Sequence, residues 1–277
     1  KKTALSVGLA AACTIAGAGN LIKNGGAETD EKYFNGFSGK LTTEFKTGKK
    51  SYYFDGRKSA QSNEFIPVDT DKTYELGGWV KSIGKDSPRV LLGLIPFDAQ
   101  KRLIRIESVF CIPDTDTVLA ADAAKGTTQI KIKNGANWIK AKYACVAFNT
   151  KKDLSDLPNR DLSKLGISAL ETKDGVTTVT LRSPLSKSYK AGVAVREHRA
   201  GGTYIYTAAT GKYAPPRWTR YSGKISGIDT KNGNSPPNKF RKGTKYVKLF
   251  LEIYFRKATD NGKLAIDDLE FKEVPKK

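Results

Sequence analysis

One stretch near the C-terminus combines aromatic and charged side chains at the spacing of a β-strand. Apolar residues there alternate with a second set: Tyr246, Lys248, Phe250, Glu252, Tyr254 and Arg256. Because successive side chains of a strand point to opposite faces, this set shares one face of a sheet. Flat aromatic rings can pack on the C–H faces of sugar rings, and polar groups beside them can hydrogen-bond the hydroxyls. The pattern therefore predicts a carbohydrate-binding face.

Two tryptophans extend the set of predicted ligand-binding residues. Alternation puts Trp79 on the same face as Lys81, and Trp218 on the same face as Arg220. A cationic face lined by aromatic rings suits an acidic polysaccharide. Two alternatives stay open: these faces are covered by other parts of the protein or by another copy of it, and Trp79 belongs to the core.

A catalytic interpretation rests on the single histidine. His198 lies between Arg196 and Arg199, a few residues before Tyr204, and such a set could abstract a proton in a lyase. A histidine flanked by charges is more often a solvated strand residue. The sequence has no Gly-x-Ser-x-Gly elbow, P-loop or dinucleotide fingerprint. We therefore expect a protein that is not an enzyme and assign no catalytic residue.

The charge of the chain narrows the class of partner. Among 277 residues, 48 Lys and Arg against 28 Asp and Glu give a net charge of +20. Such a surface attracts polyanions, whether nucleic acid, anionic lipid or acidic polysaccharide. The remaining composition is that of an ordinary globular protein, with 39% hydrophobic and 10% aromatic residues.

The first residues favour an extracellular or cell-surface location. Lys1 and Lys2 precede an uncharged stretch rich in Ala and Gly, which ends in the small-x-small pattern Ala16-Gly17-Ala18. This is the pattern of a secretory signal peptide. Lipidation at Cys13 and retention of the apolar segment are the alternatives. Export favours acidic polysaccharide over nucleic acid, and we expect no membrane span in the mature protein.

Two cysteines remain after such a cleavage. Cys111 and Cys145 could pair in an oxidising compartment, or both could be buried free thiols. The sequence holds no Cys/His cluster that predicts a zinc site.

Hydrophobic periodicity of two predicts an all-β protein built from many short strands. Two packed sheets are expected from residues 20–111 and 213–277, which form one discontinuous β-sandwich. Residues 112–212 carry a separate strand set, at 127–133, 142–148, 176–182 and 192–197, with a polar loop at 149–164. Alternating apolar residues between Ile104 and Ile112 predict a further strand.

Three motifs resemble carbohydrate-binding modules of the xylanase-associated families 4, 9 and 22. They are Asn-Leu-Ile-Lys-Asn-Gly-Gly-Ala-Glu at 20–28, Val-Asp-Thr-Asp-Lys-Thr-Tyr-Glu-Leu-Gly-Gly-Trp-Val-Lys at 68–81, and Leu-Ala-Ile-Asp-Asp-Leu at 264–269. The resemblance implies a jelly-roll sandwich that binds a carbohydrate without catalysis. It also implies a structural calcium held by the carbonyl of Gly26 and the carboxylates of Glu28 and Asp267. The alternative is that these two carboxylates pair with Lys or Arg.

The middle of the chain resembles small β-barrel modules of bacterial surface and phage-tail proteins. The similar segments are 117–120, 126–132 and 177–192. The resemblance implies no chemistry. The fold class that we expect is therefore all-β, a jelly-roll β-sandwich interrupted by an inserted small β-barrel domain.

The whole pattern favours an exported, non-catalytic protein that binds a polysaccharide, with an acidic one preferred. The alternative is a structural subunit of an extracellular filament, sheath or surface layer. In that case residues 1–19 and the aromatic strand would contact copies of the same protein.

Overall fold

The computed structural model describes residues 19–29, 33–35, 41–230, 236–254 and 262–275. Seventeen strands and one 3-10 turn, η1 (Ile106–Ser108), make up its regular structure. The prediction of an all-β protein is confirmed. Within these described ranges no helix is long and apolar enough to cross a membrane.

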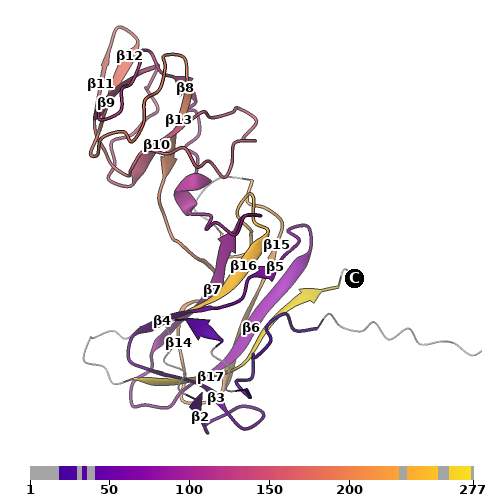
Figure 1. Ribbon diagram of the computed structural model, residues 1–277. Coiled ribbons are helices and arrows are strands. Elements are labelled where there is room, and N and C mark those ends of the chain that lie inside the picture. The colour runs from indigo at the N-terminus through magenta and orange to yellow at the C-terminus, as the bar shows by residue number, and fades with distance from the viewer. Residues whose placement is uncertain (1–18, 30–32, 36–40, 231–235, 255–261, 276–277) are drawn as a thin grey trace, which may run out of the picture.

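Two antiparallel sheets form a β-sandwich (Figure 1). The six-stranded sheet has the order β1 (Phe34–Asn35), β4 (Lys58–Ser62), β16 (Tyr246–Tyr254), β7 (Arg89–Phe97), β14 (Ile205–Tyr213), and β5 (Ile66–Pro67) also pairs with β16. The five-stranded sheet has the order β15 (Thr219–Ser226), β6 (Thr73–Ser82), β17 (Lys263–Val274), β3 (Ser51–Asp55), β2 (Leu41–Thr42). The sandwich prediction is confirmed.

The core of the sandwich lies between these two sheets. Val247, Leu249 and Leu251 of β16 are buried against residues such as Leu76 and Val80 of β6. Their neighbours in sequence point outward, because side chains of a strand alternate between its two faces. Each sheet therefore has one buried face and one outer face.

The opening segment of the chain is bonded to its closing strand. The Asn20 side chain donates to the Leu269 carbonyl (2.9 Å) and accepts from the Phe271 amide (3.0 Å). The Leu269 amide in turn donates to the Gly25 carbonyl (2.9 Å). Two segments about 250 positions apart thus close one edge of the sandwich.

The middle of the chain forms two three-stranded sheets of its own, at the opposite end of the molecule from β2 and β3 (Figure 1). One has the order β10 (Ala144–Phe148), β13 (Ala194–Arg199), β8 (Thr117–Val118), and the other β11 (Ile167–Lys173), β12 (Val176–Leu181), β9 (Gln129–Lys133). They share a separate apolar core that includes Ile132, Phe148 and Val179. Closure of these sheets into a barrel stays a prediction.

The structure corrects the predicted boundary at residue 212. All but the last residue of β14 fall inside the range assigned to the inserted part, yet the strand pairs with β7 in the six-stranded sheet. Its residues Ile205, Ala208 and Ala209 are buried in the sandwich core. Because Ile205 is buried in the sandwich core, residues 204–206 belong to the sandwich and not to the inserted part.

The strand predicted between Ile104 and Ile112 was also wrong. Ile104, Ile106 and Val109 form a small apolar cluster around η1, where the two parts of the chain meet. These side chains are buried on more than one side of the backbone, so their spacing does not reflect the two faces of a strand. The signal peptide and the filament alternative depend on residues 1–18, which lie outside the described residues, so both stay predictions.

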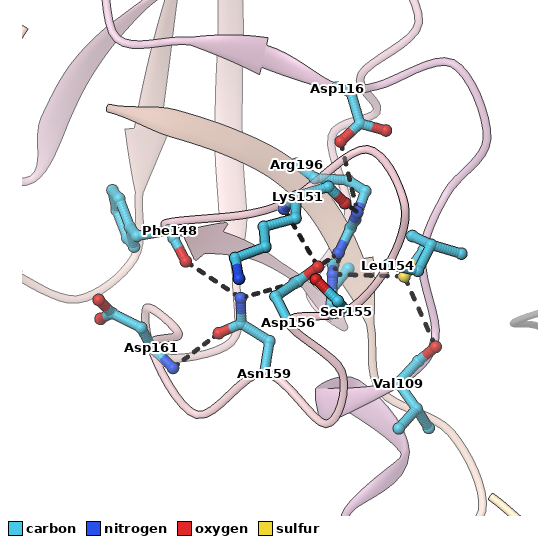
Figure 2. Close-up of polar contacts among 12 residues, drawn as sticks. Val109, Asp116, Phe148, Lys151, Leu154, Ser155, Asp156, Asn159, Asp161 and Arg196 are labelled. Carbon is cyan, nitrogen blue, oxygen red and sulfur yellow. Dashed lines mark hydrogen bonds and ion pairs between the residues drawn. The ribbon is translucent and has the colours of Figure 1, made fainter. Parts of the chain in front are cut away.

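The polar loop at 149–164 surrounds a buried ion pair (Figure 2). Arg196 of β13 is 1% exposed and donates to Asp156 at 2.8 Å. Asp156 also accepts from the Lys151 amide (3.1 Å) and the Asn159 side chain (3.0 Å). A buried charge without such partners would be costly, so the loop is held closed around Arg196.

The same loop ties the inserted part to the sandwich. Arg160 donates to Asp98 (2.9 Å) and to the Leu103 carbonyl (2.6 Å), both in the segment that follows β7. From the other side, Lys242 donates to the Leu154 carbonyl (2.7 Å). These contacts give the polar loop at 149–164 a structural role.

Cys111 and Cys145 are free, buried thiols. Cys145 lies opposite His198 on one side of β13, and Cys111 bridges to His198 on the other. Neighbouring strands are about 4.8 Å apart, so the two Cα atoms are separated by roughly two such spacings, beyond disulfide reach. Burial raises the pKa of Cys111 to about 11 and that of Cys145 to about 12.

Candidate functional site

The predicted aromatic strand lies in the middle of the six-stranded sheet. Tyr246, Lys248, Phe250, Glu252 and Tyr254 of β16 point away from the sandwich core, as alternation requires. We call this outer surface, with the side chains that pack on it from neighbouring strands, the β16 face. Arg256, the last residue of the predicted set, lies outside the described residues.

The centre of the β16 face is an aromatic stack. The Tyr204 ring lies parallel to that of Phe250, with centroids 3.6 Å apart, and Tyr206 lies beside both. Phe250 is only 3% exposed as a result. The prediction that Phe250 itself contacts a ligand is therefore corrected: the half-buried rings of Tyr204 and Tyr206 present the aromatic surface.

Gly93 of β7 allows this stack to form. Gly93 is the register partner of Phe250, and β14 is irregular between Ile205 and Ala209 at this point. A Cβ on Gly93 would lie 2.8 Å from the Tyr206 Cα and closer still to the Ile205 carbonyl oxygen. The backbone of residues 205–206 can therefore approach β7 this closely because glycine has no side chain.

One end of the β16 face joins three rings to two ammonium groups. Phe65 contacts Phe97 and Tyr246 edge-on, with centroids 4.8 and 6.3 Å away. Lys248 Nζ lies 4.3 Å from the Phe65 centroid, and Lys101 Nζ lies 5.2 Å from it. Partial burial lowers the pKa of Lys248. Both cations contact aromatic faces, which attract positive charge.

The other end places a guanidinium group between two tyrosines. The Arg89 guanidinium carbon lies 5.1 Å from the Tyr213 ring centroid and 5.6 Å from that of Tyr254. Arg89 donates to the Tyr254 hydroxyl (3.3 Å), while its buried Nε has no hydrogen-bond partner among the residues that the structure describes. Gly211 makes room here, because a Cβ at that position would lie 3.1 Å from the Tyr254 hydroxyl.

A carboxylate lies between these two cationic ends. Glu252 is the next outward residue of β16 after Phe250 and is half-buried. Partial burial and then the negative charge of Glu252 raise the pKa of both Tyr204 and Tyr206. Its cationic partner is Arg57, 3.6 Å away and 77% exposed. The charges along the face therefore run positive, negative, positive.

The two predicted tryptophans are not part of this face. Trp79 lies on the outer surface of the five-stranded sheet, on the far side of the sandwich, where Lys46 Nζ lies 4.5 Å from its ring centroid. It is half-buried rather than core. Trp218 is half-buried just before β15 of the same sheet. The structure thus brings together Tyr246, Lys248, Phe250 and Tyr254, but neither tryptophan.

Charges on this second surface are largely paired within it. Arg220 contacts Glu75 (2.9 Å) and Glu270 (3.2 Å), and Lys81 contacts Glu44 (2.8 Å).

The three residues of the predicted calcium site meet at the edge closed by the chain ends. A Cβ on Gly26 would lie 3.8 Å from the Glu28 side chain and 3.9 Å from Asp267 Oδ1. Asp267 Oδ2 accepts from the Lys46 (2.7 Å) and Thr47 (3.2 Å) amides. The partners of the two carboxylates here are backbone amides, as Glu28 Oε1 accepts from the amides of residues 49 and 50.

This donor set is of the kind that calcium takes. Carboxylates and a backbone carbonyl are hard oxygen ligands, and a carboxylate oxygen that accepts an N–H bond keeps a further lone pair. Among the described residues, no group of three or more Asp, Glu, His or Cys side chains is close enough to hold a metal. A cation here would therefore depend on two carboxylates and on backbone carbonyls together.

Of the residues in the lyase interpretation, Arg196 and His198 are buried together, whereas Tyr204 lies in the other part of the molecule. His198 is fully buried, so its prediction as a solvated residue was wrong. Its Nε2 accepts from Arg196 Nε (3.1 Å), its Nδ1 is bonded to the Glu107 carbonyl (2.7 Å), and burial lowers its pKa to about 4. Tyr204, by contrast, lies on Phe250 in the sandwich.

Sequence reasoning missed half of the β16 face. The missed residues are Phe65, Arg89, Lys101, Tyr204, Tyr206 and Tyr213. They come from four other segments of the chain, and only the order of strands in the sheet brings them to β16. The alternation of Tyr204 and Tyr206 about a buried Ile205 was the one local signal.

No family model matches the chain, and no curated protein matches it. Among solved structures, it is similar to the CBM22-1 xylan-binding domain of Paenibacillus barcinonensis Xyn10C, at 9% identity and a TM-score of 0.41, over 94% of this chain and 98% of that one. The tandem CBM22-1–CBM22-2 domain of the same protein gives 9% identity and a TM-score of 0.25, over 93% and 98%.

A phage protein is also similar. The enzymatically active domain of bacteriophage CBA120 tailspike protein 4 gives 8% identity and a TM-score of 0.37, over 92% of this chain but 21% of that one. All three TM-scores are below 0.5.

Proposed function

We propose that this protein is a non-catalytic carbohydrate-binding protein and that the β16 face is its binding surface. One observation carries the proposal: the Tyr204 ring stacks on Phe250, with Tyr206 beside it, at the centre of an outward-facing row of aromatic residues. Side chains that stack on each other and on a sheet are held in place, which reduces the entropy lost when a sugar ring packs on them.

The row is long enough for an extended polymer. Tyr246 and Tyr254 lie eight residues apart on β16, which corresponds to about 26 Å at the usual rise of a strand. Aromatic rings lie at both ends and in the middle of this length. A polysaccharide chain that lies along β16 would therefore contact rings at several points.

The cations of this face favour an acidic polysaccharide. Lys101 and Lys248 contact the Phe65 ring, and Arg89 contacts two tyrosines, where a carboxylate of the ligand could reach them. The net charge of +20 would draw such a polymer from a distance. The cationic surface and the signal-peptide pattern of residues 1–18 together support an extracellular or cell-surface role.

Affinity electrophoresis tests the proposal. The protein should migrate more slowly in gels that contain a soluble acidic polysaccharide, and Tyr204→Ala combined with Tyr206→Ala should abolish most of this retention. Tyr143→Ala is the matched control, because Tyr143 is an exposed tyrosine of the inserted part. If circular dichroism shows that both variants are folded and the gels retain them equally, the β16 face is not the binding surface.

We also propose that Gly26, Glu28 and Asp267 hold a structural calcium ion. Support comes from their convergence where the two chain ends meet and from the hard oxygen donors that they supply. The ion would stabilise the edge of the sandwich and would take no part in sugar binding, because its residues lie in the other sheet and its loops.

A further inference from the structure

The charges of the β16 face follow a fixed order along one strand. Lys248, Glu252 and Tyr254 are outward residues of β16, and Arg89 is the register partner of Tyr254. At about 3.3 Å per residue, Glu252 lies roughly 13 Å from Lys248 and about 7 Å from the Arg89 end. A ligand that lies along β16 meets a cationic end, a carboxylate and a second cationic end in turn.

Both cationic ends are built to receive an anion. At one end two ammonium groups lie on one aromatic ring, Phe65, and neither forms an ion pair with a carboxylate of the described ranges. At the other end the half-buried Arg89 guanidinium lies between Tyr213 and Tyr254 and donates to the Tyr254 hydroxyl. Among the described residues no carboxylate pairs with Arg89, so its terminal nitrogens are left to bond an anionic ligand.

The middle of the face disfavours an anion. Glu252 is half-buried beside the two tyrosine rings, and its charge acts on both hydroxyls. Its partner Arg57 is 77% exposed, and exposed ion pairs compensate charge only weakly. A ligand carboxylate placed over Tyr204 and Tyr206 would be repelled, whereas the hydroxyls of a neutral sugar could donate to Glu252.

We infer that the β16 face selects a polysaccharide in which acidic units are separated by neutral ones, with the neutral rings over Tyr204 and Tyr206 and the acidic units at the Arg89 and Lys248 ends. This inference rests on the proposed function and narrows its substrate class. It excludes a polymer in which every unit carries a carboxylate as the preferred ligand.

Retention in three polymers tests the inference. Deacylated gellan carries one acidic sugar in every four, polygalacturonate is acidic at every unit, and a neutral glucan has no charge. We expect the dissociation constant to be at least tenfold lower for gellan than for either of the others at physiological salt. Equal or tighter binding of polygalacturonate or of the glucan would overturn the inference while leaving carbohydrate binding intact. No binding to any of the three would count against the proposed function itself.

Two substitutions make the test specific to the charges of the face. Glu252→Gln should tighten binding of polygalacturonate about tenfold, and Glu273→Gln is its control, because Glu273 pairs with Lys72 in the other sheet. Arg89→Gln should weaken gellan binding about tenfold, with the exposed Lys131→Gln of β9 as the matched loss of one positive charge. If Glu252→Gln changes polygalacturonate binding no more than Glu273→Gln, Glu252 does not select the ligand and the inference fails.

Discussion

Gly93 shows how a single residue can determine a binding surface that it does not itself contact. The ring stack of Tyr204, Tyr206 and Phe250 forms because the backbone of β14 bulges onto β7 at a position without a side chain. Glycine in a strand often marks such a close approach. The aromatic surface thus depends on a residue of another strand that carries no chemistry.

Gly93→Ala should therefore impair binding without removing any aromatic residue. The new Cβ would meet the Ile205 and Tyr206 backbone, which must shift, and overpacking of this kind costs about 1–3 kcal/mol. We expect a lower melting temperature and reduced retention in polysaccharide gels. Gly202→Ala is the control, because the nearest atom to its Cβ would be 4.0 Å away. Unchanged retention of Gly93→Ala would contradict this account.

Burial of His198 should make the free energy of unfolding depend on pH in the acidic range. Its pKa is lowered from 6.5 to about 4, so below pH 6.5 the unfolded chain binds a proton that the folded protein does not. Stability should fall as the pH drops from 6.5 to about 4, by up to about 3 kcal/mol from this residue.

Urea unfolding of the wild type and of His198→Asn across this range measures the effect. The raised pKa values of Glu197 and Asp116 act in the opposite direction, but they are present in both proteins. The difference in stability between wild type and variant should shrink as the pH falls. A constant difference would show that His198 does not titrate between these limits.

At the scale of elements, the alternation of apolar and polar residues located those strands that bury one face and expose the other. It found β9, β10, β12, β13 and β16 to within two residues. It failed at 104–112, where apolar side chains are buried around a 3-10 turn rather than on one face of a sheet. Nor could it assign β14 to the right sheet, because pairing with β7 is a long-range contact.

The loop at 149–164 has a structural role that can be measured. Asp156→Ala would leave Arg196 buried with only the more distant Asp116 as its carboxylate partner, at 3.3 Å. Loss of one member of a buried ion pair typically costs about 3–5 kcal/mol. We expect that loss in chemical unfolding, whereas Asp153→Ala, an exposed aspartate of the same loop, should change stability little. Similar stabilities of the two variants would show that the loop does not depend on Arg196.

At the scale of the whole molecule, the candidate site could be predicted only in part. Tyr246, Lys248 and Tyr254 were found because they lie on one strand. Arg89 and Tyr213 join them through the order β16-β7-β14, which brings three distant segments side by side. The same long-range order separates Trp79 from them, since its strand β6 belongs to the other sheet. A sequence pattern specifies which residues share a strand face, but not which strands are neighbours.

Calcium should stabilise the whole sandwich, because its proposed residues join the opening segment to the closing strand. Ligand binding to the folded state alone contributes about 2.7 kcal/mol at a concentration 100 times the dissociation constant. For a chain of this size that is a rise of about 5–10 °C in melting temperature. We expect this shift between EDTA and excess calcium, and a smaller one for Glu28→Gln, with the exposed Glu171→Gln of β11 as control. Identical melting curves in EDTA and calcium would show that hydrogen bonds hold this edge of the sandwich together without a cation.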